Sequence, residues 1–182
     1  ALLTLVDRED APTVVFNRKV TDYLVGQHFH ECVNYTLRSA KELKTWVSDT
    51  AVQELALTNP FVEEQSHLRP TLVLGLLESL KLNQSRGNHV ARLFETGRVF
   101  MEVNGTVQEC LGAGFVLCHD PKERAWLGRP APDFPAVKRQ MEIIAASAGV
   151  DLAAQPLVPV RGAYWGWQEG HSVAAGEMQD GW

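Results

Sequence analysis

Apolar side chains recur at helical spacing near the start of the chain. Phe16, Val20 and Leu24 follow one another at intervals of four residues, and Tyr23 lies beside them. Residues at this spacing share one face of a helix, so the pattern predicts an amphipathic helix from Pro12 to Gly26. Two readings of this apolar face remain open: it covers a sheet within the chain, or it meets another subunit.

Two later segments show the same period. A stripe from Pro70 to about Gln84 predicts a second helix, and a stripe from Pro135 to Ala148 predicts a third. The residues on these stripes are Leu72, Val73, Leu76, Leu77 and Leu80 in the second helix and Val137, Met141, Ile144 and Ala148 in the third. A shorter helix is expected from Ser39 to about Trp46, because Ser39 and Glu42 have the spacing of a capping box.

Alternating or β-branched segments predict strands between these helices. The segment from Phe29 to Leu37 alternates, which would point Phe29, Val33 and Tyr35 to one side. Shorter strands are expected at Gln53 to Thr58 and at Leu157 to Val160, with strand and turn after Tyr164.

One hairpin is predicted more specifically. Ala91 to Val103 is strand-like and is followed by Asn104-Gly105. Asn-Gly favours a type I′ turn, because both residues accept positive φ. Thr106 onward should therefore pair back antiparallel, through Cys118. Hairpins and separate helices, without regular βαβ alternation, indicate an α+β fold on an antiparallel sheet.

Composition narrows the class of protein. The chain of 182 residues is 45% hydrophobic, carries a net charge of −5 and has three cysteines without CxxC spacing. The negative charge argues against a freestanding nucleic-acid binder, and the cysteine usage favours a reducing compartment. With no apolar run of membrane-spanning length, a cytoplasmic location and no membrane partner are expected. We expect residues 1–182 to form a single domain, truncated at both ends.

A resemblance becomes visible in residues 57–100. Asn59-Pro60, an acidic pair, Ser66 and Leu68-Arg69 precede a helix, and Arg92-Leu-Phe-Glu-Thr-Gly-Arg-Val-Phe100 follows it. Together these elements resemble the β subunit of bacterial phenylalanyl-tRNA synthetase. Pro70 and Leu74 depart from the family's usual residues. The motif residues are Asn59, Pro60, Glu63, Glu64, Arg69, Gly75, Arg92, Phe94, Glu95, Gly97 and Arg98.

The resemblance implies a fold, partners and cofactors. It implies a class II aminoacyl-tRNA synthetase-like antiparallel sheet flanked by helices, in a module that has lost the chemistry and packs against the catalytic α subunit. The whole heterotetrameric ligase would join phenylalanine to its tRNA using ATP and Mg²⁺, with no cofactor in this domain. Family geometry also makes the first helix, with Phe16, Val20, Tyr23 and Leu24, a candidate subunit interface. Contact with tRNA would come through the whole assembly.

The expected loss of catalysis rests on one position. In catalytic relatives a Gly-Arg-Val-(Tyr/Phe)-Arg run ends in an arginine that holds the ATP phosphate, because a guanidinium is a planar and permanent cation. This chain reads Gly97-Arg-Val-Phe-Met101, and a thioether cannot bind phosphate. A Gly-rich third motif ending in Glu-Arg is not found either. For Arg92 and Arg98 we expect structural pairing with acids such as Glu95 or Glu102 rather than an anion site.

Other candidate residues favour structural interpretations. His28, His30 and Cys32 could face one way on a strand, but no convergent further metal ligand is indicated. Cys118-His119-Asp120 are neighbours in sequence, which does not make a triad.

Two glycines and three aromatic residues also favour structural interpretations. Gly112 and Gly114 lack the lysine and helix of a phosphate loop, so close strand packing is expected there. Tyr164, Trp165 and Trp167 are expected in a partly buried strand or an interface rather than stacked on bases.

Two rival functions stay open at this point. The chain could be an active ATP-dependent ligase or adenylate-forming enzyme, which the Met101 position opposes. It could also be a regulatory paralogue that binds an amino acid or ATP in the ancestral pocket.

Overall fold

The computed structural model describes residues 10–103, 105–119, 134–152, 157–159 and 173–175. The elements follow one another as α1 (Pro12–Gly26), β1 (His30–Glu31), β2 (Leu37–Arg38), α2 (Ala40–Leu43), α3 (Asp49–Glu54), η1 (Glu63–Gln65), β3 (His67–Leu68), α4 (Val73–Ser85), β4 (Ala91–Val103), β5 (Thr106–Cys118), α5 (Phe134–Ser147), β6 (Leu157–Pro159) and β7 (Val173–Ala175).

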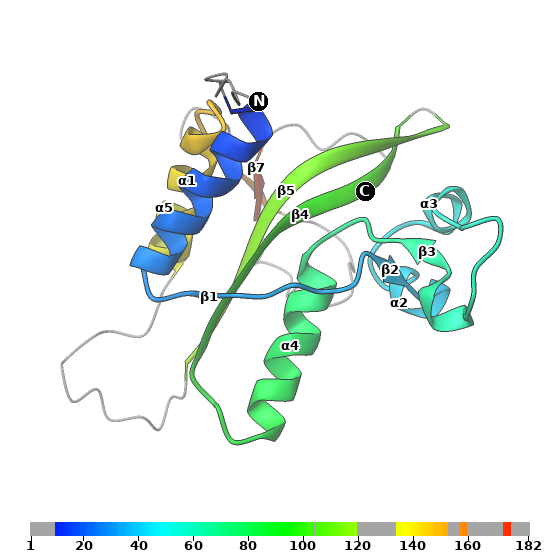
Figure 1. The fold of residues 1–182 in the computed structure, drawn as a ribbon, viewed down its shortest axis with the longest axis horizontal. Coiled ribbons are helices and arrows are strands. Elements are labelled where there is room, and N and C mark those ends of the chain that lie inside the picture. The colour runs from blue at the N-terminus through cyan, green and yellow to red at the C-terminus, as the bar shows by residue number, and fades with distance from the viewer. Residues whose placement is uncertain (1–9, 104, 120–133, 153–156, 160–172, 176–182) are drawn as a thin grey trace, which may run out of the picture.

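A long hairpin forms the centre of the molecule. β4 and β5 pair antiparallel along their whole lengths, and β1 adds a short parallel strand beside β4. Helices α1 and α5 lie on one side of the hairpin and α4 lies on the other (Figure 1). The hairpin therefore separates two layers of core.

Each layer has its own apolar cluster. Val20 and Leu24 of α1 pack with Phe29 and Phe94 on one face, and Leu72 and Leu76 pack with Ala91 and Leu93 on the other. Burial of such side chains stabilises the fold by roughly 1.5–3 kcal/mol each.

A small lobe covers the far end of the hairpin. It contains α2, α3, η1 and the antiparallel pair β2–β3 (Figure 1). Its core of Leu43, Val52 and Leu55 packs against Phe100 of β4 and Val107 of β5. The lobe thus covers part of the strand that carries Met101.

Several sequence predictions are confirmed. The first helix has the predicted bounds, α5 differs from its prediction by one residue at each end, and β4 and β5 form the predicted hairpin. The capping box is also present: Glu42 N–H donates to Ser39 Oγ, and Ser39 N–H donates to Glu42 Oε2. The helix it starts is shorter than predicted: it ends at Leu43, and turns continue the chain through Trp46.

Other predicted elements are wrong. The segment Gln53 to Thr58 is not a strand: α3 occupies Asp49–Glu54, capped by Ser48, because Val52 and Leu55 are buried at helical spacing. Only the bridge between Ala56 and His67 remains of the predicted strand. Helix α4 begins at Val73 rather than Pro70.

The predicted strand from Phe29 to Leu37 is broken into β1 and β2. Phe29 is 3% exposed, whereas Val33 is 94% and Tyr35 76% exposed, so these three side chains do not share one face. The chain follows β4 as far as Cys32, whose N–H donates to the Phe94 carbonyl oxygen, and from Thr36 it bonds to the β3 segment instead, where Arg69 N–H donates to the Thr36 carbonyl oxygen.

The last part of the chain is described only in short pieces. β6 matches the strand predicted at Leu157 to Val160 and pairs antiparallel with β7. Within the described ranges, no helix is both long and apolar enough to cross a membrane.

Candidate functional site

A buried ion pair joins the helix α4 region to the sheet. Arg69 Nη1 donates to Glu95 Oε1 over 2.6 Å, and both residues are buried. Arg69 Nε donates to the Arg98 carbonyl oxygen over 2.8 Å, and Asn34 Nδ2 donates to Glu95 Oε2 over 2.7 Å. These contacts occupy both oxygens of the carboxylate, which is what allows a charge to be buried.

Two of the family-motif glycines make room for this network. A Cβ at Gly97 would overlap Arg69 Nη2, and a Cβ at Gly75 would lie 2.6 Å from Asn34 Cβ. Any side chain at either position would displace a member of the network. Arg69, Gly75, Glu95 and Gly97, which are scattered in the sequence motif, therefore meet at one place.

The arginines of β4 have partners within the chain. Arg98 forms a cross-strand ion pair with Glu109, and Arg92 Nη1 donates to the Gln27 carbonyl oxygen while its guanidinium lies over the Phe29 ring. The expectation that both arginines are paired structurally holds. The partners expected, Glu95 and Glu102, are wrong, because Glu95 is already engaged by Arg69.

Met101 lies on β4 opposite Gln108 and is half-buried. Further along the hairpin, where Gly112 pairs with Gly97 and Gly114 with Glu95, the Leu72 side chain covers the sheet face: it lies 3.7 Å from the position of a Cβ at Gly112 and 3.3 Å from that at Gly114. Close packing thus accounts for Gly114, where a Cβ would be tight against Leu72, whereas a Cβ at Gly112 would make only ordinary contacts.

The remaining motif residues lie on or near the surface of the lobe. Asn59 and Pro60 are exposed in the loop before η1, and Glu63 and Glu64 are exposed on η1. Phe94, by contrast, is fully buried in the core.

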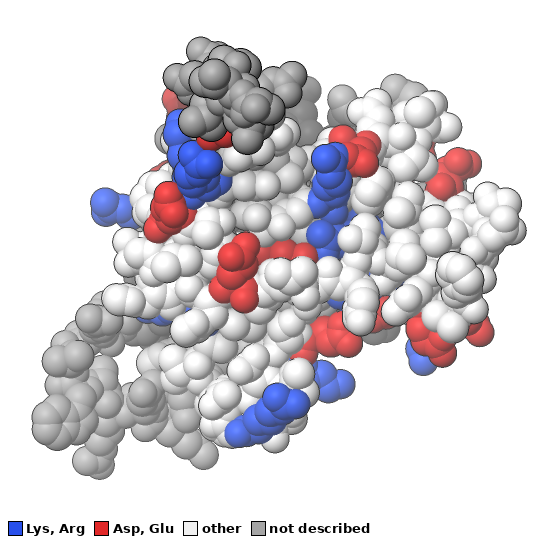
Figure 2. All heavy atoms as spheres, in the orientation of Figure 1, with Lys and Arg blue, Asp and Glu red and all other residues white. Residues whose placement is uncertain are grey.

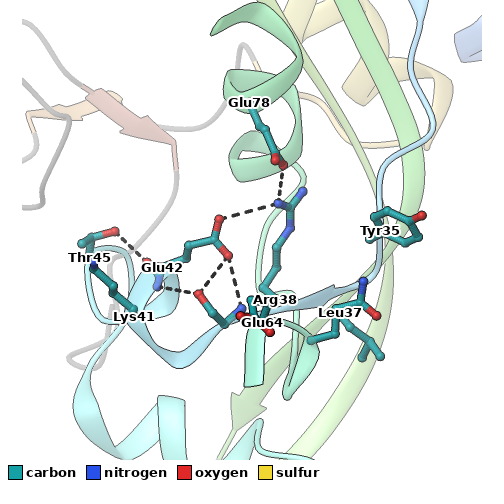
Figure 3. A pocket seen from close by; sticks show the side chains of 10 residues that line it. Tyr35, Leu37, Arg38, Lys41, Glu42, Thr45, Glu64 and Glu78 are labelled. Carbon is teal, nitrogen blue, oxygen red and sulfur yellow. Dashed lines mark hydrogen bonds and ion pairs between the residues drawn. The ribbon is translucent and has the colours of Figure 1, made fainter. Parts of the chain in front are cut away.

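A cavity of about 640 Å³ opens between the lobe and α4 (Figure 3). Glu42 and Glu78 both point toward the Arg38 guanidinium, with Arg38 Nη1 donating to Glu78 Oε2 over 2.7 Å (Figure 3). Arg38 is buried, and its Nε has no hydrogen-bond acceptor among the described residues. Other lining residues are Tyr35, Leu37, Ser39, Lys41, Thr45, Glu64 and Gln65.

The sequence did not point to this cavity. Arg38 was the available signal, because an arginine in a run of strand-forming residues must find a carboxylate if it is buried. Its partners, Glu42 and Glu78, come from separate helices, and only the fold brings them together.

The candidate interface on the first helix faces inward. Val20 and Leu24 have no exposed surface, and Phe16 and Tyr23 are partly buried against the same cluster. Tyr23 also donates to Gln140 Oε1 of α5 over 2.7 Å, and burial raises the pKa of its phenol although Arg139 opposes the shift. Val20 and Leu24 therefore cover the sheet, whereas Phe16 and Tyr23 keep part of their surface exposed, and a contact between α1 and another subunit stays a prediction.

The other candidates are partly covered by the structure. In the part of the chain that the structure describes, no group of three His, Cys, Asp or Glu side chains could hold a metal ion, so His28, His30 and Cys32 are not brought together with further ligands. Asp120, Tyr164, Trp165 and Trp167 lie outside the described residues.

Comparison with known proteins decides the family. Residues 3–164 match the model of the phenylalanyl tRNA synthetase beta chain CLM domain. The chain belongs to this family.

Relatives agree with that assignment. The CLM-domain chain is 31% identical over 144 residues to the phenylalanine–tRNA ligase beta subunit of Novosphingobium aromaticivorans, covering 78% of this chain and 18% of the relative. It is 34% identical over 134 residues to that of Bacillus cereus, covering 69% and 16%. The CLM-domain chain therefore spans about a sixth of the length of the curated relatives it matches.

Solved structures confirm the class II synthetase fold. A pyrrolysyl-tRNA synthetase of Desulfitobacterium hafniense aligns with a TM-score of 0.59 at 16% identity, over 82% of this chain and 49% of that one. A histidine–tRNA ligase subunit of Alicyclobacillus acidocaldarius aligns with a TM-score of 0.54 at 14% identity, over 84% and 45%. At such identities the likeness concerns the fold alone, and it agrees with the α+β class expected from the sequence.

Proposed function

We propose that this chain is a non-catalytic core module of a phenylalanine–tRNA ligase β subunit, and that it scaffolds the α subunit. The whole heterotetrameric enzyme would use ATP and Mg²⁺ to attach phenylalanine to its tRNA in the cytoplasm. In this proposal the CLM-domain chain itself binds neither the nucleotide nor the metal.

One observation carries the proposal: the guanidinium groups around β4 are committed to protein partners. Arg69 is fixed by Glu95 and by the Arg98 carbonyl oxygen, and Arg98 pairs with Glu109. Met101 follows on the same strand, where the resemblance calls for the phosphate-binding arginine. A phosphate clamp needs a free cation with bidentate geometry, and the residues here do not fit ATP.

The packing of α4 supports the same conclusion. Leu72 and Leu76 are buried against the hairpin face, and a Cβ added at Gly114 would lie 3.3 Å from Leu72 and 3.4 Å from Leu76. Opening this face for a nucleotide would expose both leucines to water, which costs about 1.5–3 kcal/mol for each side chain.

The charge of the chain argues against direct binding of tRNA by this module. The chain carries a net charge of −5, and Figure 2 shows acidic and basic side chains interspersed over one face without an extended basic patch. Binding to a phosphate backbone depends on such patches. We infer that tRNA meets the assembled enzyme chiefly through other parts.

Calorimetry with the purified chain tests the proposal. We expect no binding heat with ATP–Mg²⁺ or with phenylalanine at micromolar concentration, whereas an intact phenylalanine–tRNA ligase should bind both. Saturable heat with either ligand would favour the rival reading, an amino-acid- or ATP-binding domain that uses the ancestral pocket.

A further inference from the structure

The small lobe, residues 36–69, begins and ends at the same place in the fold. Arg69 N–H donates to the Thr36 carbonyl oxygen over 3.0 Å, so the two ends of the lobe are bonded to each other. Within these ends, Ser66 N–H donates to the Arg38 carbonyl oxygen over 3.1 Å. The lobe is therefore closed by its own backbone hydrogen bonds, and the chain enters it and leaves it side by side.

The core of the lobe is separate from the two apolar layers of the hairpin. In the part of the chain that the structure describes, neither the cluster between α1 and the sheet nor the cluster between α4 and the sheet contains a side chain of the lobe. The lobe core around Leu43 and Leu55 meets the rest of the chain through Phe100 and Val107 of the hairpin and Leu74 of α4. The hairpin therefore keeps both of its own layers when the lobe is absent.

Arg69 links the lobe to the sheet by polar contacts. Its guanidinium donates to the buried Glu95 carboxylate over 2.6 Å, and its carbonyl oxygen accepts the Phe100 N–H over 3.0 Å. Arg38 adds an ion pair with Glu78 of α4, but the Glu78 side chain is largely exposed to solvent. Because an ion pair with an exposed partner contributes little to stability, Arg69 is the stronger polar link.

The lobe has too little core to keep its fold after leaving the sheet. Chains below about 40 residues usually need disulfides, metals or oligomerisation to fold alone. Residues 36–69 are fewer than that and include no cysteine. Their buried side chains also complete their packing on Phe100. Detachment of the lobe and its unfolding are therefore one event, of the kind that local unfolding units show in other proteins.

We propose that residues 36–69 detach and unfold as one cooperative unit while the hairpin, α1 and α4 stay folded, and that Arg69 is the latch that keeps this unit closed. Opening breaks the pair between Arg69 and Glu95 and uncovers Phe100 and Val107 on the hairpin. This inference concerns the chain's own conformations and does not depend on the proposed function.

Hydrogen exchange of the purified chain, followed by mass spectrometry, tests the inference under conditions in which the exchange rate reports the opening equilibrium. Peptides that contain the bonded amides of Leu57 and Leu68 should share one opening constant. That constant should be at least about tenfold larger than the constant of hairpin peptides around Phe94 and Phe115, which stay folded in the open state. One constant common to lobe and hairpin would overturn the inference, and so would unrelated constants within the lobe.

Arg69→Lys tests the latch, because lysine keeps the positive charge but lacks the forked donors of a guanidinium. We expect the opening constant of the lobe peptides to rise by about tenfold or more, and that of the hairpin peptides to change by less than about twofold. Arg18→Lys is the matched control, since its exposed pair with Asp10 lies at α1 and should affect neither set.

Two results with Arg69→Lys would contradict the latch. Equal increases in the lobe and in the hairpin would show that the two unfold together, and an unchanged constant in the lobe would show that Arg69 does not hold it closed. Circular dichroism checks that the variant folds. Where it does not fold, the comparison of lobe and hairpin peptides in the wild-type chain decides the inference.

Discussion

Arg69 and Glu95 are 26 residues apart in sequence and form an ion pair of 2.6 Å that is almost completely removed from water. The pair connects the segment before α4 to the central strand, and Asn34 and the Arg98 carbonyl oxygen complete its hydrogen bonds. A buried charge is stable only while its partner remains. This pair therefore fixes how the small lobe and α4 meet the sheet.

Removing one partner of the pair should be strongly destabilising. We expect Arg69→Leu or Glu95→Leu to lower the free energy of unfolding by about 3–5 kcal/mol, because each leaves an uncompensated buried charge. Urea unfolding measures the change. The control is Arg18→Leu, which breaks an exposed pair with Asp10 and should cost about 1 kcal/mol or less. Equal losses at the two sites would contradict this account.

Gly75 should not tolerate even a methyl group. Its Cβ would lie 2.6 Å from Asn34 Cβ and 2.7 Å from Arg38 Nη2. We expect Gly75→Ala to destabilise the fold by about 1–3 kcal/mol, the usual range for overpacking. Gly26→Ala, where nothing lies within 4 Å, should be neutral or stabilising because it restricts the unfolded chain. Thermal melts compare the two, and a neutral Gly75→Ala would show that Asn34 can move aside.

His28 is a strained residue at the end of α1. Its φ of 63° lies in the left-handed region, which costs a residue with a Cβ about 1–2 kcal/mol. His28→Gly should therefore raise the midpoint of urea unfolding without changing the slope. A lower midpoint would mean that the His28 side chain makes a stabilising contact larger than the strain.

Cys32 should react slowly with alkylating reagents. Burial raises the pKa of the Cys32 thiol, and the charges of Glu95 and Glu31 raise it further against a hydrogen bond with Ser79. A raised pKa leaves less thiolate at pH 8, and thiolate is the reactive form.

The Cys110→Ser/Cys118→Ser double variant isolates Cys32 for this measurement. The pH profile of its iodoacetamide rate should be shifted to higher pH in the native protein than in urea. Because the folded-state pKa is the higher one, this thiol's contribution to stability is present below the unfolded pKa and is lost as pH rises toward the folded value. Coincident native and denatured profiles would contradict the burial argument.

Local signals predicted most elements of this fold. The spacing of Phe16, Val20 and Leu24 gave the bounds of α1, and the turn residues at 104 and 105 placed the hairpin. Where the prediction from the sequence is wrong, contacts between residues distant in sequence determine the structure. The sequence predicts a strand from Gln53 to Thr58, whereas helix α3 reaches Glu54, because Val52 and Leu55 are buried in the lobe core against Phe100 of β4.

The candidate site was less predictable than the fold. The sequence motif named Arg69, Gly75, Glu95 and Gly97, but nothing local showed that they meet at one network. Glu95 follows Leu93 and Phe94 and is buried, so its charge needs a cation. Only the fold shows that Arg69 supplies this cation. The prediction from the sequence paired Glu95 with Arg92 or Arg98, and it is wrong.

The exchange of radiolabelled pyrophosphate into ATP, in the presence of phenylalanine and Mg²⁺, tests the absence of catalysis most directly. We predict no exchange above background by the purified chain, and none by its Met101→Arg variant, because Leu72 and Leu76 still cover the sheet face. Phenylalanine-dependent exchange by the wild-type chain would contradict the account.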